Sequence, residues 1–188
     1  MRRKAIVVAL FGAAALMALG VAAFAVAGEG TSNVKSDEFT GYQESAPAAV
    51  SSTGTGSFGA NIDDEAQTIT YELRYSGLES NATQSHIHFG DRHQNGGISA
   101  FLCSNLGNGP AGTPACPLGT TAAGEAVVTG TITPAQVIGP TSQGILPTQF
   151  EELVRALRAG VAYANVHTTT FPAGEVRGQL NDPNQRTP

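Results

Sequence analysis

The sequence contains no tryptophan and few charged side chains. Charged residues make up 13% of its 188 residues, about half of the share that is usual in globular proteins. Glycine, by contrast, occurs 23 times. Few charges together with many small residues favour strands joined by tight turns over a bundle of amphipathic helices. The length suffices for one domain with its own hydrophobic core.

The short motifs of several large enzyme classes are also absent. The sequence has no GxSxG, no HExxH, no P-loop and no GxGxxG after a predicted strand. A cysteine nucleophile is not expected either, because the chain has only two cysteines and we expect them to be bridged. The sequence therefore favours a protein without enzymatic activity, and it leaves the question open.

The two cysteines are Cys103 and Cys116. In an exported chain, an even pair at short spacing predicts a disulfide. Such a bridge stabilises the fold by roughly 3 kcal/mol, because it restricts the unfolded chain. The alternatives are two free thiols or a metal pair, and the second is disfavoured because there is no other pair of cysteines.

The N-terminus has the pattern of a Sec-type signal peptide. Basic residues at 2–4 precede an uncharged run over 5–27, which ends in the small-x-small sequence Ala-Val-Ala. We expect cleavage after residue 27, followed by a linker over 28–36, and a secreted, cell-surface or periplasmic location. The alternative is an uncleaved membrane anchor, because the apolar run is long enough to span a bilayer.

Charge limits the partners of the mature chain. Loss of residues 1–27 removes three of the 10 basic residues and none of the 15 acidic ones, which leaves a net charge of −8. A chain this acidic is not expected to bind nucleic acid or an anionic bilayer. No second apolar span follows residue 28. The expected partner is a protein or a small ligand outside the membrane.

Strand patterns dominate from residue 37 onward. In TITYELRYS at 68–76, apolar residues alternate with polar ones, which is typical of a strand with one solvated face. About eight strands are predicted, over 38–44, 54–62, 68–76, 85–89, 98–103, 125–133, 161–169 and 174–180. A capping box at 148–151 predicts a helix, and a shorter one at 133–136 starts with proline.

These elements predict a mainly β fold, a Greek-key antiparallel sandwich or barrel with one or two short helices in the connections. The β domain is expected to span 37–182, with a flexible tail over 183–188. Residues 103–121 are rich in Gly and Pro and are predicted to form one long loop that the disulfide pins.

The histidines are the best candidates for metal ligands. His86 and His88 are two residues apart on a predicted strand, so their side chains should share one face and can share one metal ion. His167 ends another predicted strand and completes a three-histidine site if the two strands lie close together. Asp91 and His93 in the following loop are weaker candidates. The alternative is a hydrogen-bonded polar ladder without a metal.

The segment 163–180 predicts a β-hairpin. Phe-Pro-Ala-Gly at 171–174 has Pro and Gly at the second and fourth positions of a β-turn. Glu175 and Arg177 share a face of the second strand and are candidates for an ion pair, which contributes about 0–1 kcal/mol if exposed. The residues expected to stabilise the hairpin are Asn165, Thr168, Pro172, Gly174, Glu175 and Arg177.

Four blocks together resemble the CHRD domain, a family named after chordin that also occurs in exported bacterial proteins. The blocks are LRYSGL at 73–78, HIH at 86–88, YANVHT at 163–168 and FPAGEVRGQL at 171–180. The resemblance covers roughly residues 37–182, and the last block is the most specific. It implies a β-rich extracellular module without an established enzymatic activity or cofactor. The loop between the two cysteines is not part of this resemblance.

A second, weaker likeness involves HIHFGD at 86–91, which is similar to the copper-ligand strand of copper–zinc superoxide dismutase, a Greek-key barrel. Here the segment is one residue shorter before Gly-Asp, and the chain has only four histidines, too few for a copper–zinc pair. Two functions follow as hypotheses. The first is a non-enzymatic, exported structural or binding module; the alternative is a protein that binds one copper or zinc ion.

Overall fold

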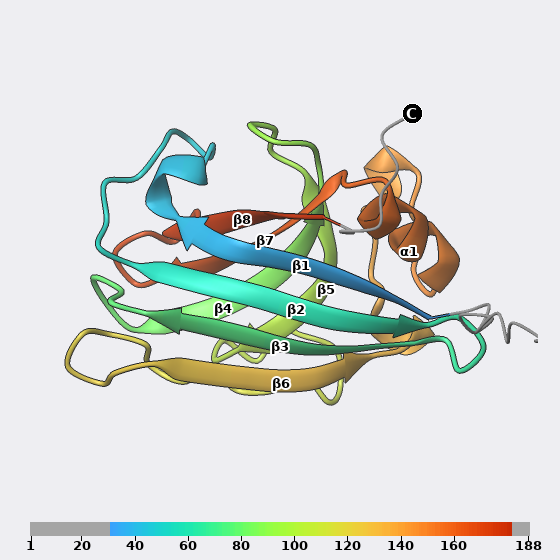
Figure 1. Ribbon diagram of the computed structural model, residues 1–188, viewed down its shortest axis with the longest axis horizontal. Coiled ribbons are helices and arrows are strands. Elements are labelled where there is room, and N and C mark those ends of the chain that lie inside the picture. The colour runs from blue at the N-terminus through green and yellow to red at the C-terminus, as the bar shows by residue number, and fades with distance from the viewer. Residues whose placement is uncertain (1–30, 182–188) are drawn as a thin grey trace, which may run out of the picture.

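In the computed structural model, which describes residues 31–181, eight antiparallel strands form one nearly closed, barrel-like sheet with Greek-key connections. Its strand order is β5-β4-β7-β8-β1-β2-β3-β6. Figure 1 shows β1, β2, β3 and β6 nearer the viewer, with the other four strands behind them. The mainly β prediction is confirmed. The strands are β1 (Thr31–Thr40), β2 (Thr55–Asp63), β3 (Thr68–Ser76), β4 (Ala82–Phe89), β5 (Gly97–Ser104), β6 (Ala126–Ile132), β7 (Ala162–Thr168) and β8 (Val176–Leu180).

The front strands have one buried and one exposed face. On β3, Ile69 and Leu73 are fully buried in the core, whereas Thr70 and Glu72 between them are exposed. β6 continues this pattern, and its Val127 side chain is 40% exposed. This alternation follows from the two-residue period of a strand whose outer face meets solvent.

The rear strands are buried on both faces. Every residue of β7 and of β8 is buried, including those whose side chains point away from the barrel interior. Two connections cover that outer face: the segment 41–54, which contains the 3-10 helix η1 (Gly41–Gln43), and the loop 90–96. Ser45 and Asn95 link the two coverings, because the Ser45 hydroxyl lies 2.8 Å from the Asn95 side-chain oxygen.

The sheet is open between β5 and β6, its two edge strands. Tyr71 of β3 crosses this seam, and its hydroxyl donates a hydrogen bond of 2.6 Å to the carbonyl of Leu102 on β5. The tyrosine ring lies over Gly130, its cross-strand partner on β6. A Cβ at Gly130 would overlap the phenol ring, so glycine is required there for the side chain to pass.

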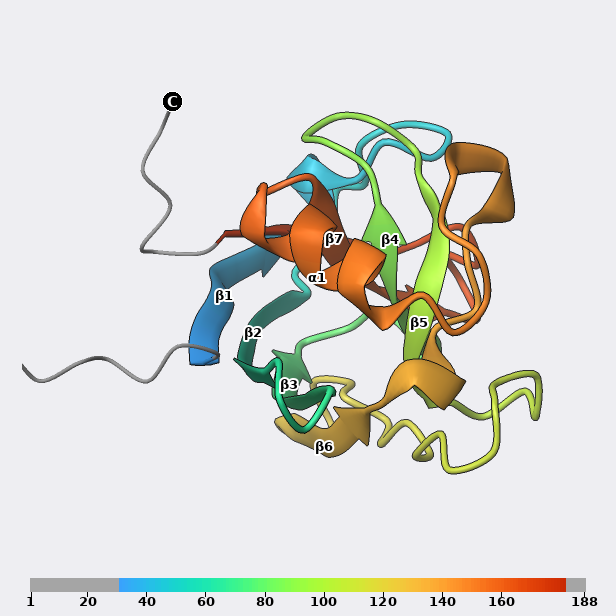
Figure 2. The same ribbon diagram turned by 90° about the vertical axis from the view of Figure 1, so that its right-hand side faces the viewer.

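One α-helix, α1 (Phe150–Arg158), lies at one end of the barrel in Figures 1 and 2. The predicted capping box at its start is wrong: no side chain caps the helix, Gln149 is the N-cap, and Thr148 has a positive φ of 70°. The Gln149 side chain instead accepts a hydrogen bond from the backbone N–H of Leu146. The second predicted box, at 133–136, is present, but it starts only the 3-10 helix η2 (Pro134–Gln136). A third short turn is η3 (Thr141–Gln143).

The chain enters the sheet earlier than the sequence indicated. β1 already begins at Thr31 and pairs with β2 over most of its length, so residues 31–36 form part of the sheet rather than a linker. The predicted signal peptide over 1–27 and the predicted tail over 183–188 lie outside the described residues. Within 31–181, no helix is long and apolar enough to cross a bilayer.

Candidate functional site

Three histidine side chains meet on the outer face of strands β4 and β7. His86 and His88 are two residues apart on β4, while Ile87 between them lies in the hydrophobic core. β7 pairs with β4, and its Val166 lies in the core, so His167 next to it points to the outer face. All three histidines are buried, with at most 7% of the residue exposed.

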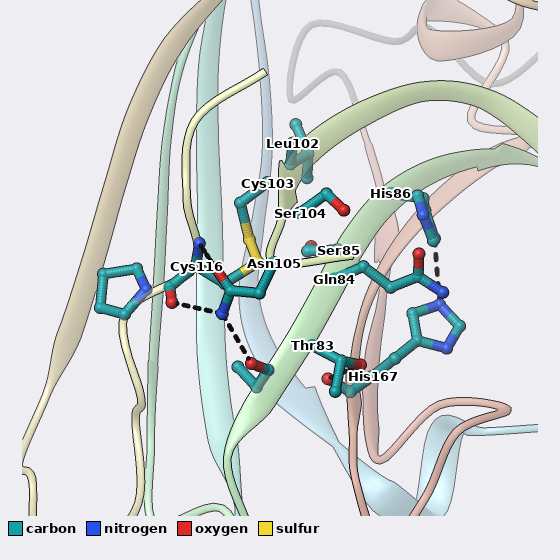
Figure 3. Close-up of a disulfide and its surroundings, with 12 residues drawn as sticks. Thr83, Gln84, Ser85, His86, Leu102, Cys103, Ser104, Asn105, Cys116 and His167 are labelled. Carbon is teal, nitrogen blue, oxygen red and sulfur yellow. Dashed lines mark hydrogen bonds between the residues drawn. A yellow bond between two sulfur atoms is a disulfide. The ribbon is translucent and has the colours of Figure 1, made fainter. Parts of the chain in front are cut away.

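The imidazole rings are close enough to share one ligand. Nδ1 of His86 lies 3.1 Å from Nε2 of His167, the contact drawn between these rings in Figure 3. The ring centroid of His88 is 5.4 Å from that of His86. One ligand nitrogen from each of the three residues lies within 4.8 Å of the other two. Nitrogens bound to one zinc ion at about 2.0 Å in tetrahedral geometry lie roughly 3.3 Å apart.

Backbone carbonyls orient two of the rings. Nδ1 of His88 lies 2.9 Å from the carbonyl oxygen of Gly96, and Nδ1 of His167 lies 3.0 Å from that of Pro172. A carbonyl oxygen only accepts hydrogen bonds, so both Nδ1 atoms carry a proton and donate it. In the neutral rings, Nε2 of His88 and of His167 therefore each present a lone pair.

Burial keeps the three rings uncharged. It lowers the pKa of His86 to about 2, with further contributions from the nearby His167 and His88. The pKa of His88 falls to about 4, because burial outweighs the hydrogen bond to Gly96. Burial also lowers the pKa of His167. At neutral pH, the cluster consists of neutral imidazoles, which is the form that binds metal ions.

A buried carboxyl group and an amide complete one side of the cluster. Nε2 of His88 lies 3.1 Å from Oδ1 of Asn165, whose side chain also forms a hydrogen bond with Glu44. Burial raises the pKa of Glu44 to about 7, against the opposing effect of the positive charge on Arg177. Among the described residues, Oε1 of Glu44 has no hydrogen-bond partner.

Arg177 holds the two covering segments in place. Its guanidinium group donates hydrogen bonds to the Ser45 hydroxyl (2.6 Å) and to the carbonyls of Gln94 (2.8 Å) and Asp91 (3.0 Å). The side chain is fully buried, and burial lowers its pKa. A planar guanidinium with five donors suits this task, because it can serve several acceptors at once.

Tyr163 connects Arg177 with the histidines. The guanidinium carbon of Arg177 lies 3.3 Å from the centroid of the Tyr163 ring, a cation–π contact. The His88 ring is parallel to the same tyrosine ring at 4.7 Å between centroids. We call this buried set the polar layer; its members are Glu44, His86, His88, Tyr163, Asn165, His167 and Arg177.

Glu175 does not form the ion pair with Arg177 that the sequence suggested. Its Oε1 accepts hydrogen bonds from the Ser52 hydroxyl (2.6 Å) and the backbone N–H of Glu79 (2.8 Å), and its Oε2 accepts one from the Thr168 hydroxyl (2.7 Å). Glu175 precedes β8 and turns toward the loop around Ser52, whereas Arg177 points to the polar layer. Each side chain is therefore satisfied by its own neighbours.

The predicted hairpin is present, and its turn lies against the polar layer. β7 and β8 pair in antiparallel fashion, and the N–H of Gly174 donates to the carbonyl of Phe171 at 3.1 Å, as in a β-turn. Gly174 has a positive φ of 133°, and a Cβ at this position would overlap Oε1 of Glu44. Only glycine leaves room there for the buried carboxyl group. Pro172 contributes the carbonyl that orients His167.

The two weaker candidate ligands lie outside the histidine cluster. Asp91 and His93 are in the loop 90–96, and both side chains are exposed. The cluster within metal-binding distance contains His86, His88 and His167 alone among the described residues. Asp91 contributes to the polar layer through its backbone carbonyl, which accepts from Arg177.

The predicted disulfide between Cys103 and Cys116 is present and lies at the other side of β4 from the histidines (Figure 3). Asn105 fixes the bridged loop. Its side-chain N–H groups donate to the carbonyls of Ala82 and Cys116, and its Oδ1 accepts from the N–H of Cys116. The bridge therefore joins the end of β5 to a long loop that packs on the start of β4.

Sequence reasoning missed two members of the polar layer. Tyr163 could have been found, because it shares the two-residue period with Asn165 and His167 on one strand. Glu44 has no such signal: it follows η1 in an irregular segment, and only the folding of that segment over β7 brings it to Asn165.

The comparisons with known proteins found one family match. The family model for the CHRD domain matches residues 36–180, which nearly coincides with the range 37–182 expected from the motifs. No curated protein and no solved structure matched the chain. The match covers most of the chain, including every strand from the middle of β1 to the end of β8. The chain therefore belongs to the CHRD domain family.

Proposed function

We propose that this chain is an exported CHRD module that works outside the cytoplasm by binding and not by catalysis. The observation that carries the export half is the disulfide between Cys103 and Cys116. Disulfides of this kind persist in oxidising compartments and are rare in the cytosol. The basic and apolar pattern of residues 1–27 supports the same location.

The most specific family motif, FPAGEVRGQL at 171–180, has a structural role that supports binding over catalysis. Arg177 ties two covering segments to the sheet, and Glu175 ties β8 to Ser52 and Glu79. Both side chains are buried and engaged in hydrogen bonds. The side chains of this motif therefore stabilise the fold. Recognition of a partner is left to the surface and to the histidine cluster.

The export half is tested with the full 188-residue chain in a Sec-competent host. Intact-mass measurement of extracytoplasmic protein is expected to show a chain that starts at Gly28, with no free thiol under denaturing, non-reducing conditions. The matched control is Leu16→Arg, which interrupts the apolar run and should leave the protein in the cytoplasm with reduced cysteines. A mass that retains residues 1–27 would make this segment an anchor, and two free thiols in the exported protein would contradict the proposal.

The second half of the proposal, the absence of enzymatic activity, is tested with superoxide dismutation. This reaction is relevant because the sequence around His86 and His88 is similar to the copper-ligand strand of superoxide dismutase. The purified protein, incubated with one equivalent of copper, is expected to dismute superoxide no faster than the same copper bound to free histidine. The physical reason is that all three rings are buried, with at most 7% of each residue exposed. A rate that exceeds this background and disappears in His88→Ala would establish an enzyme.

A further inference from the structure

The histidine cluster contains more lone pairs than the described residues can satisfy. Three neutral imidazoles carry three N–H protons. Two of these protons are donated to the carbonyls of Gly96 and Pro172. The remaining four ring nitrogens, two on His86 and the Nε2 atoms of His88 and His167, share the one proton that is left. Three lone pairs therefore lie in one small, buried volume.

One donor inside the cluster relieves only part of this excess, because the remaining proton, placed on Nδ1 of His86, is donated to Nε2 of His167 at 3.1 Å. Nε2 of His86 is buried and has no partner among the described residues. Nε2 of His88 faces Oδ1 of Asn165, which is a second acceptor as long as the Asn165 N–H group is donated to Glu44. A buried polar atom without a hydrogen-bond partner destabilises the fold, because its desolvation is not compensated. A cation at the centre of the cluster would remove this cost for several atoms at once.

The surroundings have the arrangement that supports metal-bound histidines in proteins. A ligating histidine donates its other ring N–H to a carbonyl or carboxylate, which fixes the tautomer and the ring orientation. His88 and His167 do so toward Gly96 and Pro172 at 2.9 and 3.0 Å. These contacts aim the two Nε2 atoms inward before any ion arrives.

From these observations, we propose that His86, His88 and His167 bind a single copper or zinc ion through one nitrogen of each ring. The donor set identifies the class of metal, because imidazole nitrogen suits copper and zinc, whereas magnesium and calcium require oxygen ligands. The described cluster offers three ligands, which suffices for one ion with a fourth coordination position left for a water molecule. This inference goes beyond the proposed function and does not depend on export.

The test is metal uptake by the purified, chelator-treated protein, followed by calorimetry with zinc and with copper salts. One ion per chain is expected, with magnesium giving no heat under the same conditions. His88→Ala and His167→Ala are expected to weaken binding by more than about 100-fold, since loss of a supporting contact alone costs 10–100-fold. The matched control is His93→Ala, an exposed histidine outside the cluster, which should bind as the unmutated protein does.

A measurement without substitutions guards against variants that fail to fold. In the unmutated protein, zinc is expected to shift the ring-nitrogen NMR signals of His86, His88 and His167 and to leave those of His93 in place. The proposal is overturned if the protein takes up no ion at a hundredfold excess of zinc or copper, if His93→Ala abolishes uptake, or if only the His93 signals move. In each of these cases, the cluster is a hydrogen-bonded polar layer alone, and the export result is unaffected.

Discussion

Strand β4 buries its two faces in different ways. Ile87 points into the barrel, where its neighbours are apolar. His86 and His88 point outward, where the Phe101 ring contacts His86 and the loop 90–96 contacts His88. Both faces exclude water. On the inner face, burial is stabilising in itself. On the outer face, burial is tolerated only as far as each polar atom finds a partner.

The comparison teaches that burial and apolarity are separate properties of a sheet. The front strands follow the simple rule, with an apolar inner face and a solvated outer face, as on β3 and β6. On β7 and β8, the outer face is as buried as the core although it carries Tyr163, Asn165 and Arg177. The contributions of the two faces to the free energy of unfolding should therefore respond differently to truncation of a side chain, to pH and to exposure to solvent.

The largest expected effect is on the outer face, at its central cation. Arg177→Ala removes the charged donor that the Ser45 hydroxyl and the carbonyls of Asp91 and Gln94 share, and it releases both covering segments. We expect the free energy of unfolding to fall by about 4 kcal/mol, as for other broken buried charge networks. Urea denaturation measures this loss. Arg177→Lys keeps the charge but lacks the planar guanidinium, so it should recover less than half of the lost stability. A loss below about 1 kcal/mol for the alanine variant would show that Arg177 does not hold the polar layer together.

The inner face of β4 should respond to lost volume. Ile87→Ala removes apolar atoms from a fully buried site and is expected to cost about 3 kcal/mol, with Ile87→Val costing about 1 kcal/mol. Because no titrating group is involved, both losses should be the same at pH 7 and at pH 5.5 in denaturation experiments. A loss that changes with pH would mean that the two faces are coupled through the strand.

The outer face should make stability depend on pH in the metal-free protein. In the folded protein, the pKa of His86 is about 2 and that of His88 is about 4, whereas both are near 6.5 in the unfolded chain. As the pH falls below 6.5, the unfolded chain therefore takes up protons before the folded protein does. The free energy of unfolding decreases as a result. Glu44 acts in the opposite direction: its pKa of about 7 exceeds the unfolded value of 4.5, so it destabilises the fold as the pH rises from 4.5 to 7. From pH 7 to 5.5, we expect a net loss of about 1 kcal/mol.

A single substitution separates these opposing contributions. Glu44→Gln removes the carboxyl group that titrates and keeps an uncharged side chain of the same size. The loss of stability between pH 7 and 5.5 should then at least double in chemical denaturation at both pH values. If the free energy of unfolding depends on pH as in the unmutated protein, Glu44 does not titrate in this range. If the variant becomes more stable as the pH falls, the histidines are protonated in the folded protein.

The smallest effect is expected on the exposed outer face of the front strands. Val127→Thr exchanges one β-branched side chain for another at a 40% exposed position of β6. The free energy of unfolding should change by less than about 0.5 kcal/mol. Thermal unfolding of the two proteins provides the measurement. A larger effect would indicate that this face is covered in solution, which would remove the contrast between front and rear strands.

Much of the fold could be predicted from local sequence patterns. The alternation at 68–76, the Pro and Gly of the turn at 171–174 and the His-x-His step are local signals, and the structure has a strand, a turn and a shared face at these places. The polar outer face of β7 could not be recognised as buried, because a two-residue period shows which side chains share a face and not what covers that face.

The errors have two physical origins. Thr148 and Glu151 match a capping box in sequence, but Thr148 has a left-handed backbone, whereas an N-cap residue is normally extended, and Gln149 is the N-cap instead. Glu175 and Arg177 share a face by period, yet distant residues offer each of them better partners. In the second case, contacts between segments far apart in the sequence override a local pattern.

The open seam between β5 and β6 has a consequence for how copies of this protein meet each other. An edge strand with free backbone groups is a template for pairing with another chain. Here the Tyr71 hydroxyl occupies the carbonyl of Leu102 on one edge, and the Tyr75 hydroxyl occupies the carbonyl of Pro117 in the adjoining loop, each at 2.6 Å. Two phenol groups from a strand inside the sheet thus occupy acceptors at the seam that a second copy of the chain could otherwise use for edge-to-edge pairing.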